Sequence, residues 1–259
     1  MDHYGKSEGI PMNSILNLQS SHRSVRKFKD RPVEESLFRE LVKTAQCAAT
    51  SHHVQAYVVI RVKDGETRKQ IADLAGPQPW VEQAPVFLIF CADLTRLESV
   101  CLGQGLEPET AWAEQFIVAT VDTAILAQNL MIAAESQGLG GVFIGGIRND
   151  PARICELLEI PRLAYPVFGM CLGYPDHQPD IKPRLPLDLV LREDRFYGSG
   201  ESRVEKDLAR YDRTMREYYL SRDSNIKDQT WQGQMADFMS RVIRPHMKSF
   251  LEERGFFLK

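Results

Sequence analysis

The sequence predicts a domain of the α+β or α/β class, because runs with strand composition alternate with runs that have helical periodicity. Residues 54–62 and 85–92 are rich in β-branched and aromatic side chains, which favour strands. Two further strands are expected at 141–144 and 166–173. Between the two pairs lies the most pronounced helix, over 113–137.

Other helices are expected on both sides of this central part. A short helix over 14–19 precedes a basic cluster, and a proline followed by two glutamates predicts a helix over 32–49. Towards the end of the chain, a charged helix over 203–220 and an amphipathic helix over 231–254 flank a polar loop.

The expected domain organisation is simple. Residues 1–13 are a polar N-terminal arm, and residues 14–259 are a single domain in which 192–259 form a helical C-terminal extension.

The helix over 113–137 is apolar on most of its sides rather than along one stripe. Such a helix has to be covered on most sides. Either it passes through the middle of the core, or one of its faces meets another subunit. The periodicity alone favours neither arrangement.

Composition and charge exclude several classes of protein. The chain has 259 residues with 32 basic and 35 acidic side chains, a balance that argues against nucleic acid as the main partner. Asp122 and Glu135 interrupt the longest apolar tract, so no membrane span is expected. The polar first dozen residues lack the apolar core of a signal peptide, which indicates a cytoplasmic protein. The five cysteines form no CxxC pair or other metal-ligand pattern, so no metal site is expected.

Two short basic segments are candidates for binding an anion. Residues 22–26 (HRSVR) place two guanidinium groups, an imidazole and a hydroxyl within five positions, and arginine suits phosphate oxygens. Residues 182–184 (KPR) are held extended by the proline. Each segment alone is also typical of a solvated basic turn, but two of them in a net acidic chain favour one shared anion.

The glycine-rich segment 138–146 is not a dinucleotide-binding fingerprint. That motif follows a strand and opens a helix, whereas here the long helix ends at Gly138 and a strand follows. Gly145 and Gly146, which come after the strand, would let backbone amides approach a flat ligand closely. A plain glycine turn is the alternative.

No motif of a hydrolase is present in the sequence. There is no GxSxG and no HExxH, and the pair His52-His53 lacks a third ligand at metal-binding spacing.

Seven segments taken together resemble the oxygen-insensitive NADPH nitroreductase family, and most closely its flavin-reductase-P-like branch. They are HRSVRKF, GPQPWV, AEQ at 113–115, VDTAILAQN, AAESQGLGGVFIGGIRN, FGMCLGYP and KPRLP. The resemblance runs in register from about residue 14 to residue 255. It implies an α+β sandwich with a central mixed sheet, a homodimer that binds FMN at the subunit interface, and a C-terminal arm that embraces the partner.

The resemblance also implies an FMN site. Its residues would be His22, Arg23, Ser24, Arg26, Thr50, Gln78, Ile144, Gly145, Gly146, Lys182 and Arg184. Lys182 and Arg184 would serve the phosphate and the polar edge of the flavin, and Gln78 would hydrogen-bond the isoalloxazine. No side chain would be a catalytic acid or base, while Arg26 and Lys182 would give electrostatic support to the chemistry on FMN.

The chain departs from the family pattern in one loop. Thr50 stands where the family has a serine, and Ser51-His52-His53 replaces a serine-rich, phenylalanine-containing loop that borders the substrate pocket. Glu114 matches a family pocket residue, for which we expect only a weak structural or proton-handling role.

For NADPH, the resemblance points to Arg222 as the cation for the 2′-phosphate, with Lys227 at a second basic position. Lysine lacks the bidentate fork of arginine, and the neighbouring Asp228 would weaken the binding of an anion. We therefore expect a preference for NADPH over NADH that is not strict.

The activity implied is transfer of a hydride from NADPH to FMN and then to a nitroaromatic, a quinone or a flavin. One alternative is an NADPH–FMN reductase that supplies reduced flavin to a partner monooxygenase. Another is a flavin-binding sensor without enzyme activity.

Overall fold

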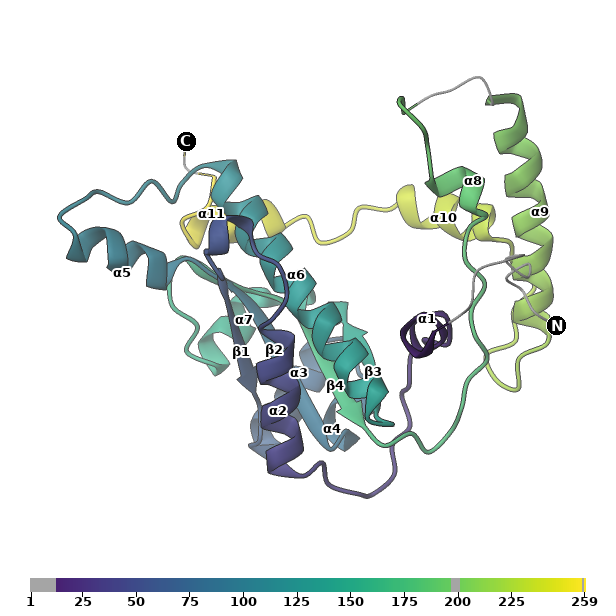
Figure 1. Cartoon of the computed structure of the whole chain (residues 1–259), viewed down its shortest axis with the longest axis horizontal. Coiled ribbons are helices and arrows are strands. Elements are labelled where there is room, and N and C mark those ends of the chain that lie inside the picture. The colour runs from purple at the N-terminus through teal and green to yellow at the C-terminus, as the bar shows by residue number, and fades with distance from the viewer. Residues whose placement is uncertain (1–12, 197–200, 258) are drawn as a thin grey trace. The chain divides into compact units, whose positions relative to one another are not determined.

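The computed structural model describes residues 13–196, 201–257 and 259 (Figure 1). The predicted N-terminal arm lies outside the described residues except for Asn13. The Asn13 side chain accepts hydrogen bonds from the Ile15 and Leu16 amides, at 3.1 and 2.9 Å, and so caps the first helix, α1 (Ser14–Ser20).

The described chain forms two compact units. The first comprises Asn13–Pro179 and Arg244–Lys259, and we call it the sheet unit. The second is Asp180–Ile243, and we call it the helical unit. Each unit is described by itself.

A four-stranded sheet in the order β1-β2-β4-β3 is the centre of the sheet unit. Its strands are β1 (Tyr57–Arg61), β2 (Val86–Asp93), β3 (Gly140–Ile144) and β4 (Ala164–Gly173). All neighbouring strands pair antiparallel. A single parallel bridge joins Ser24 to Gly141, so within the described residues the predicted mixed sheet is mixed only through this bridge.

Helices cover both faces of the sheet, which gives the predicted α+β sandwich (Figure 1). Strand β2 is buried along its whole length, and its side chains alternate between the two faces. Phe90 packs with α2 (Glu35–Ala45) and α6 (Ala113–Ser136) on one face. Phe87 belongs to the core on the other face, which contains residues of α3 (Gly65–Leu74), α4 (Pro79–Gln83), α7 (Pro151–Leu157) and α11 (Met247–Glu253).

Helix α6 agrees closely with its prediction. It ends at Ser136, and Gly138 follows in the left-handed region with φ +75°, as expected for the residue that terminates a helix. Among the described residues it is the one helix long and apolar enough to cross a membrane. The core helix of a soluble protein meets the same criteria, and α6 packs against the sheet.

Two predicted boundaries were wrong by several residues. Helix α2 ends at Ala45 rather than residue 49, because the Cys47 and Ala48 amides bond to carbonyls three residues earlier and tighten the last turn. Strand β1 begins at Tyr57 rather than residue 54, because Gln55 has φ +51° and cannot continue an extended strand.

The prediction of one helix over 231–254 was also wrong. The structure has α10 (Trp231–Met239) in the helical unit and α11 in the sheet unit. Pro245 lacks an amide hydrogen and disfavours helical geometry at the preceding residue, and Arg244 has φ +51°.

The helical unit contains α8 (Leu187–Val190), α9 (Glu201–Leu220) and α10. Its small core is built on Tyr211, Met215 and Tyr219 from one side of α9, and Trp231 of α10 packs against it. The predicted loop between α9 and α10 is present. Short elements complete the chain: η1 (Ser51–His53), α5 (Thr95–Gly103) and η2 (Gly145–Asn149).

Candidate functional site

The basic segment 22–26 lies against the start of β3. The Val25 amide donates to the Gly141 carbonyl at 2.9 Å, and Val25 is buried. A β-carbon on Gly140 would lie 2.6 Å from Val25 Cγ2, so a glycine is needed for this close approach. The glycine-rich segment therefore first serves to seat the basic segment.

His22 and Arg23 make different contacts. His22 Nδ1 lies 2.6 Å from Glu135 Oε1 near the end of α6, and both side chains are largely buried. The Arg23 guanidinium donates to the carbonyls of Ser21 and Pro179, each at 3.1 Å. Arg23 is thus partly occupied in holding backbone, whereas His22 is oriented by a carboxylate.

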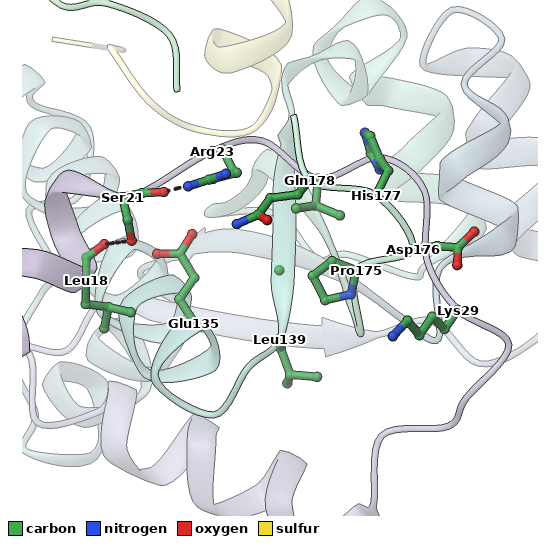
Figure 2. Close-up of a pocket in the computed structure, with 12 residues that line it drawn as sticks. Leu18, Ser21, Arg23, Lys29, Glu135, Leu139, Pro175, Asp176, His177 and Gln178 are labelled. Carbon is green, nitrogen blue, oxygen red and sulfur yellow. Dashed lines mark hydrogen bonds between the residues drawn. The ribbon is translucent and has the colours of Figure 1, made fainter. Parts of the chain in front are cut away.

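Arg23 and Glu135 also line an open pocket of about 490 Å³, a volume in the range of small-molecule sites (Figure 2). In Figure 2, Ser21, Arg23 and Glu135 lie on one side of this pocket, and Lys29 and Asp176 lie on the other. Its lining is Leu18, Ser21, Arg23, Val25, Lys29, Glu135, Leu139, Gly140, Pro175, Asp176, His177 and Gln178. Of the predicted FMN residues, only Arg23 is part of this pocket.

A second group of predicted residues meets around Gln78, the residue that precedes α4. Gln78 Nε2 donates to the Ala75 carbonyl at 2.7 Å, and Gln78 Oε1 accepts from Trp80 Nε1 at 3.0 Å. The Arg26 guanidinium carbon lies 5.8 Å from the centre of a Trp80 ring, within the range of a cation–π contact. These contacts bring Arg26 and Gln78 to one place and fix the orientation of the Gln78 amide.

Gly146 belongs to the same group. A β-carbon at this position would lie 2.1 Å from the Ala75 carbonyl oxygen and 2.7 Å from Gln78 Nε2. Any side chain would displace the backbone before α4, so the protein's own packing already requires glycine. A β-carbon on Gly145 would meet only Arg148 Nη2, at 3.5 Å, so there is space at this position. Ile144 is buried at the end of β3.

Thr50 lies towards the opposite edge of the sheet. The loop after Thr50 leads into β1, and the neighbouring Ser51 amide donates to Asp122 Oδ1 on α6 at 3.0 Å. Gly145 and Gly146 follow β3, and β1 and β3 are the two edge strands. Three strand spacings separate these edges, on the order of 14 Å.

The loop after Thr50 is strained. His52, His53 and Gln55 all have positive φ, at 46°, 60° and 51°. A left-handed conformation costs a residue with a β-carbon roughly 1–2 kcal/mol, so the surroundings must hold this loop in place. Two backbone hydrogen bonds to the buried Asp122 do so, from the amides of Ser51 and Ala56.

The remaining predicted residues lie in the helical unit, around the adjacent rings of Tyr218 and Tyr219. Lys182 Nζ lies 5.6 Å from the centre of the Tyr219 ring, and the Arg222 guanidinium carbon lies 5.9 Å from both rings. The backbone amide of Lys227 approaches the Tyr219 carbonyl at 3.4 Å. Tyr211 Oη donates to the Pro183 carbonyl at 3.0 Å and so ties the KPR segment to α9.

The charges of this basic cluster act on both tyrosines. Burial raises the pKa of Tyr218 against the opposing charges of Arg222 and Arg184. Burial also acts to raise the pKa of Tyr219, but hydrogen bonds with Lys182 and Gln234 and the charges of Lys182 and Lys227 outweigh it, so the pKa is lowered. Lys182 and Arg184, predicted for FMN, therefore form one cluster with Arg222 and Lys227, predicted for NADPH.

Asp228 does not pair with this cluster in the structure. Its carboxylate binds Arg216 in a bidentate ion pair, which lowers the pKa of Asp228. The negative charge that we expected to weaken anion binding is thus balanced by Arg216. Among the described residues, no ion pair links Lys182, Arg184, Arg222 or Lys227 to a carboxylate.

Glu114 is exposed in the first turn of α6, where a carboxylate interacts favourably with the helix dipole.

The sequence analysis missed the roles of Glu135, Trp80 and Asp122. Glu135 is 113 positions from His22, so no local signal links the two residues. Trp80 is two residues from Gln78, and an indole donor beside a predicted ligand was a usable signal.

The fold and these clusters define an α+β protein. Its sheet unit contains the polar group around Gln78, and its helical unit contains the basic cluster around Tyr218 and Tyr219. The profile of the Nitroreductase family matches residues 20–174, and that of the Nitroreductase family, C-terminal domain, matches residues 182–259. The chain belongs to the nitroreductase family.

Individual relatives are similar over almost the whole chain. The oxygen-insensitive NADPH nitroreductase of Salmonella typhimurium is 39% identical over 245 residues, which cover 95% of this chain and 99% of that protein. The FMN reductase (NADPH) of Bacillus subtilis is 37% identical over 247 residues, 95% of this chain and 99% of that protein. The solved structure of NfrA1 from B. megaterium matches with a TM-score of 0.90 at 40% identity, over 95% of this chain and all of that chain.

Proposed function

We propose that the protein is an FMN-dependent oxidoreductase that uses NADPH to reduce nitroaromatics, quinones or flavins in a ping-pong reaction. The observation that carries this proposal is the basic cluster around Tyr218 and Tyr219, in a chain that resembles an NADPH nitroreductase and an FMN reductase over 95% of its length. We further propose a cytoplasmic location and a single nitroreductase domain that includes both units.

The residues present fit FMN. Lys182 and Arg184 are cations without an ion-paired carboxylate in the described chain, as a phosphate ester requires. Gln78 retains one amide hydrogen and one acceptor site beyond its two contacts, and these suit the polar edge of a flavin. When bound, FMN would supply the hydride-accepting and hydride-donating centre.

The chain's own residues would then orient the cofactor and stabilise its charge. Trp80 and the Ala75 carbonyl hold the Gln78 amide in one orientation, and Glu135 orients His22. Arg26 and Lys182 would stabilise negative charge at the polar edge of the cofactor. No side chain in this scheme has to be a catalytic acid or base.

Arg222 and Lys227 would hold the 2′-phosphate of NADPH. Arg222 lies over two tyrosine rings rather than in an ion pair, which leaves its charge available to an anion. Both residues are in or next to an exposed loop, so part of the binding energy would be lost in ordering it. We therefore propose a moderate preference for NADPH over NADH.

We also propose a homodimer with the flavin sites shared between chains. Ile117, Val121 and Ile125 form an apolar stripe on α6 at helical spacing, with side chains 51%, 48% and 40% exposed. Thr50 and Gly146 are towards opposite edges of the sheet, so one flavin is better served by Thr50 of one chain and Gly146 of the other. Sedimentation that showed a flavin-loaded monomer would contradict this proposal.

The test of the function starts from the colour of the purified protein. We expect a yellow protein that releases about one FMN per chain on denaturation and that oxidises NADPH with a quinone as acceptor. Replacing Arg184 by alanine should reduce FMN retention about tenfold, because a charge-assisted phosphate contact is lost. A colourless protein that does not take up added FMN would reject the proposal.

The similarity to an FMN reductase favours one second candidate, a reductase that supplies reduced flavin to a partner monooxygenase. Such an enzyme releases its flavin product. If FMN stays bound through gel filtration and added FMN is not consumed, the nitroreductase or quinone reductase function is favoured instead.

A further inference from the structure

Asp122 is a buried carboxylate that holds both ends of a loop in which His52 and His53 are exposed. It lies on α6 and is 1% exposed. Its Oδ1 accepts from the Ser51 amide at 3.0 Å, and its Oδ2 accepts from the Ala56 amide at 3.3 Å. Each carboxylate oxygen therefore binds one end of the segment 51–56.

The loop between these two anchors is in a conformation that its sequence does not favour. His52, His53 and Gln55 have positive φ, although none of them is glycine. The side chains within the loop support one another only weakly, with Ser51 Oγ and His52 Nδ1 at 3.2 Å and Gln55 Nε2 and His53 Nε2 at 3.2 Å. Strained loops persist where the surroundings over-determine them, and here the surroundings include Asp122.

We infer that Asp122 is a positioning residue for the acceptor step of the reaction, in which a quinone or nitroaromatic reoxidises the flavin. By fixing Ser51 it fixes the adjacent Thr50, and by fixing the loop it sets the place of His52 and His53. This inference rests on the proposed function, in which Thr50 lies at the flavin.

The acceptor step should depend on this loop more than the NADPH step does. In the proposed function NADPH is held by remote cations, Arg222 and Lys227, and such remote binding energy can offset a local misplacement. A quinone or nitroaromatic has no comparable remote group. Its productive geometry depends on the groups immediately around the flavin, where small displacements are costly.

The central variant is Asp122→Asn. Asparagine has nearly the same shape but only one acceptor oxygen, so it can bind only one of the two amides. We expect about one flavin per chain and an unchanged rate of flavin reduction by NADPH in anaerobic stopped flow. Reoxidation by a quinone should have a kcat/KM lower by about tenfold or more, as expected when a hydrogen bond to a charged group is lost.

Asp93→Asn is the matched control. Asp93 is a carboxylate with similar burial, at 4% exposed, and it accepts from the amide and hydroxyl of Thr95 at 2.9 and 2.6 Å at the start of α5. This variant should lose stability without a selective loss in the acceptor step. Equal losses of the acceptor step in the two variants would overturn the inference.

A second variant leaves the core intact in case Asp122→Asn does not fold. His52→Gly together with His53→Gly relieves the strain of positive φ but opens many further conformations, so the loop is no longer confined to one. We expect slower reoxidation by the quinone and unchanged reduction by NADPH. An unchanged acceptor step in every folded variant would overturn the inference, as would a parallel loss of both steps.

These outcomes are distinct from a failure of the proposed function. If wild-type protein binds no FMN or does not oxidise NADPH, the proposed function is rejected before any variant is compared. If the wild type is active and Asp122→Asn changes neither step, only the role of Asp122 is rejected.

Discussion

Trp80 and Gln78 form a pair in which one side chain sets the orientation of the other. The indole hydrogen on Trp80 Nε1 binds Gln78 Oε1, and the Gln78 amide nitrogen in turn binds the Ala75 carbonyl. Without the indole donor, the amide has one fixed contact instead of two. A glutamine that is to hydrogen-bond a flavin edge would then have to be ordered by the ligand itself.

We therefore expect Trp80→Phe to weaken FMN binding while the aromatic contact with Arg26 is kept. The loss of one neutral hydrogen bond is worth about 1 kcal/mol, or about fivefold in the FMN dissociation constant. Fluorescence titration of the apoprotein with FMN measures this. Trp112→Phe is the control, because the Trp112 indole binds the exposed Glu109 at 3.0 Å outside the Gln78 group. Equal effects of the two substitutions would reject the role of Trp80.

Arg222 is the residue on which the choice of nicotinamide donor should depend. We expect Arg222→Ala to raise the KM for NADPH about tenfold and to leave NADH turnover nearly unchanged, because only binding of the phosphate is removed. The measurement is kcat/KM for both donors. Arg241→Ala is the matched control, since Arg241 lies in the same unit and is paired with Asp237 at 2.6 Å. If NADPH and NADH lose equally in Arg222→Ala, this arginine is structural.

At the scale of elements, Tyr165 joins β4 to α6. Its hydroxyl lies 2.6 Å from Thr120 Oγ1, and burial raises the pKa of Tyr165 to about 12, with the Thr120 contact opposing. An unfolded tyrosine titrates near 10. The neutral form is favoured in the folded state, so its contribution to stability is complete below pH 10 and is lost as the pH rises towards 12.

We expect the free energy of unfolding to fall by up to about 3 kcal/mol over this range through Tyr165 alone. Urea unfolding at a series of pH values measures it. Tyr165→Phe lacks the ionisable group, so the difference in stability between the two proteins should narrow as the pH rises from 10 to 12. A difference that stays constant over this range would show that Tyr165 does not titrate with the transition.

The elements that sequence reasoning located well are those with a strong local signal. Strands β2 and β4 are dense in apolar residues, and α6 has 24 residues that end shortly before a glycine. Helix α3 was missed although its signal is present, since Asp64 caps it by accepting from the Thr67 amide at 2.8 Å. The break at Pro245 was also readable from the sequence.

The site was less accessible to sequence reasoning than the fold, for a physical reason. Contacts such as Glu135 with His22 and Asp122 with Ser51 join residues 113 and 71 positions apart, and only the packing of α6 brings them together. Gly146 illustrates a different limit. The sequence indicates that a small residue is needed there, but only the structure shows that the Ala75 carbonyl requires it.

At the scale of the molecule, the predicted flavin residues fall into groups on different elements of the chain. Gln78, Arg26 and Gly146 are one group, whereas Thr50 precedes the loop into β1, the edge strand opposite β3. If two chains share each site, a defect in Thr50 and a defect in Arg26 damage the same site from different subunits. This arrangement can be tested by mixing subunits.

Two variants with defective sites should complement each other. Thr50→Trp obstructs the flavin from one side, and Arg26→Glu reverses a charge on the other, so each homodimer should retain little FMN. In a heterodimer with shared sites, one site carries both defects and the other carries none. Random mixing makes half of the dimers heterodimers with one intact site each, so co-expression should restore about one quarter of the wild-type FMN content. If both residues served the same chain's flavin, every site would carry one defect and no FMN would return. That outcome would place Thr50 and Arg26 at a site built from a single chain, and the dimer would then lose its role in completing it.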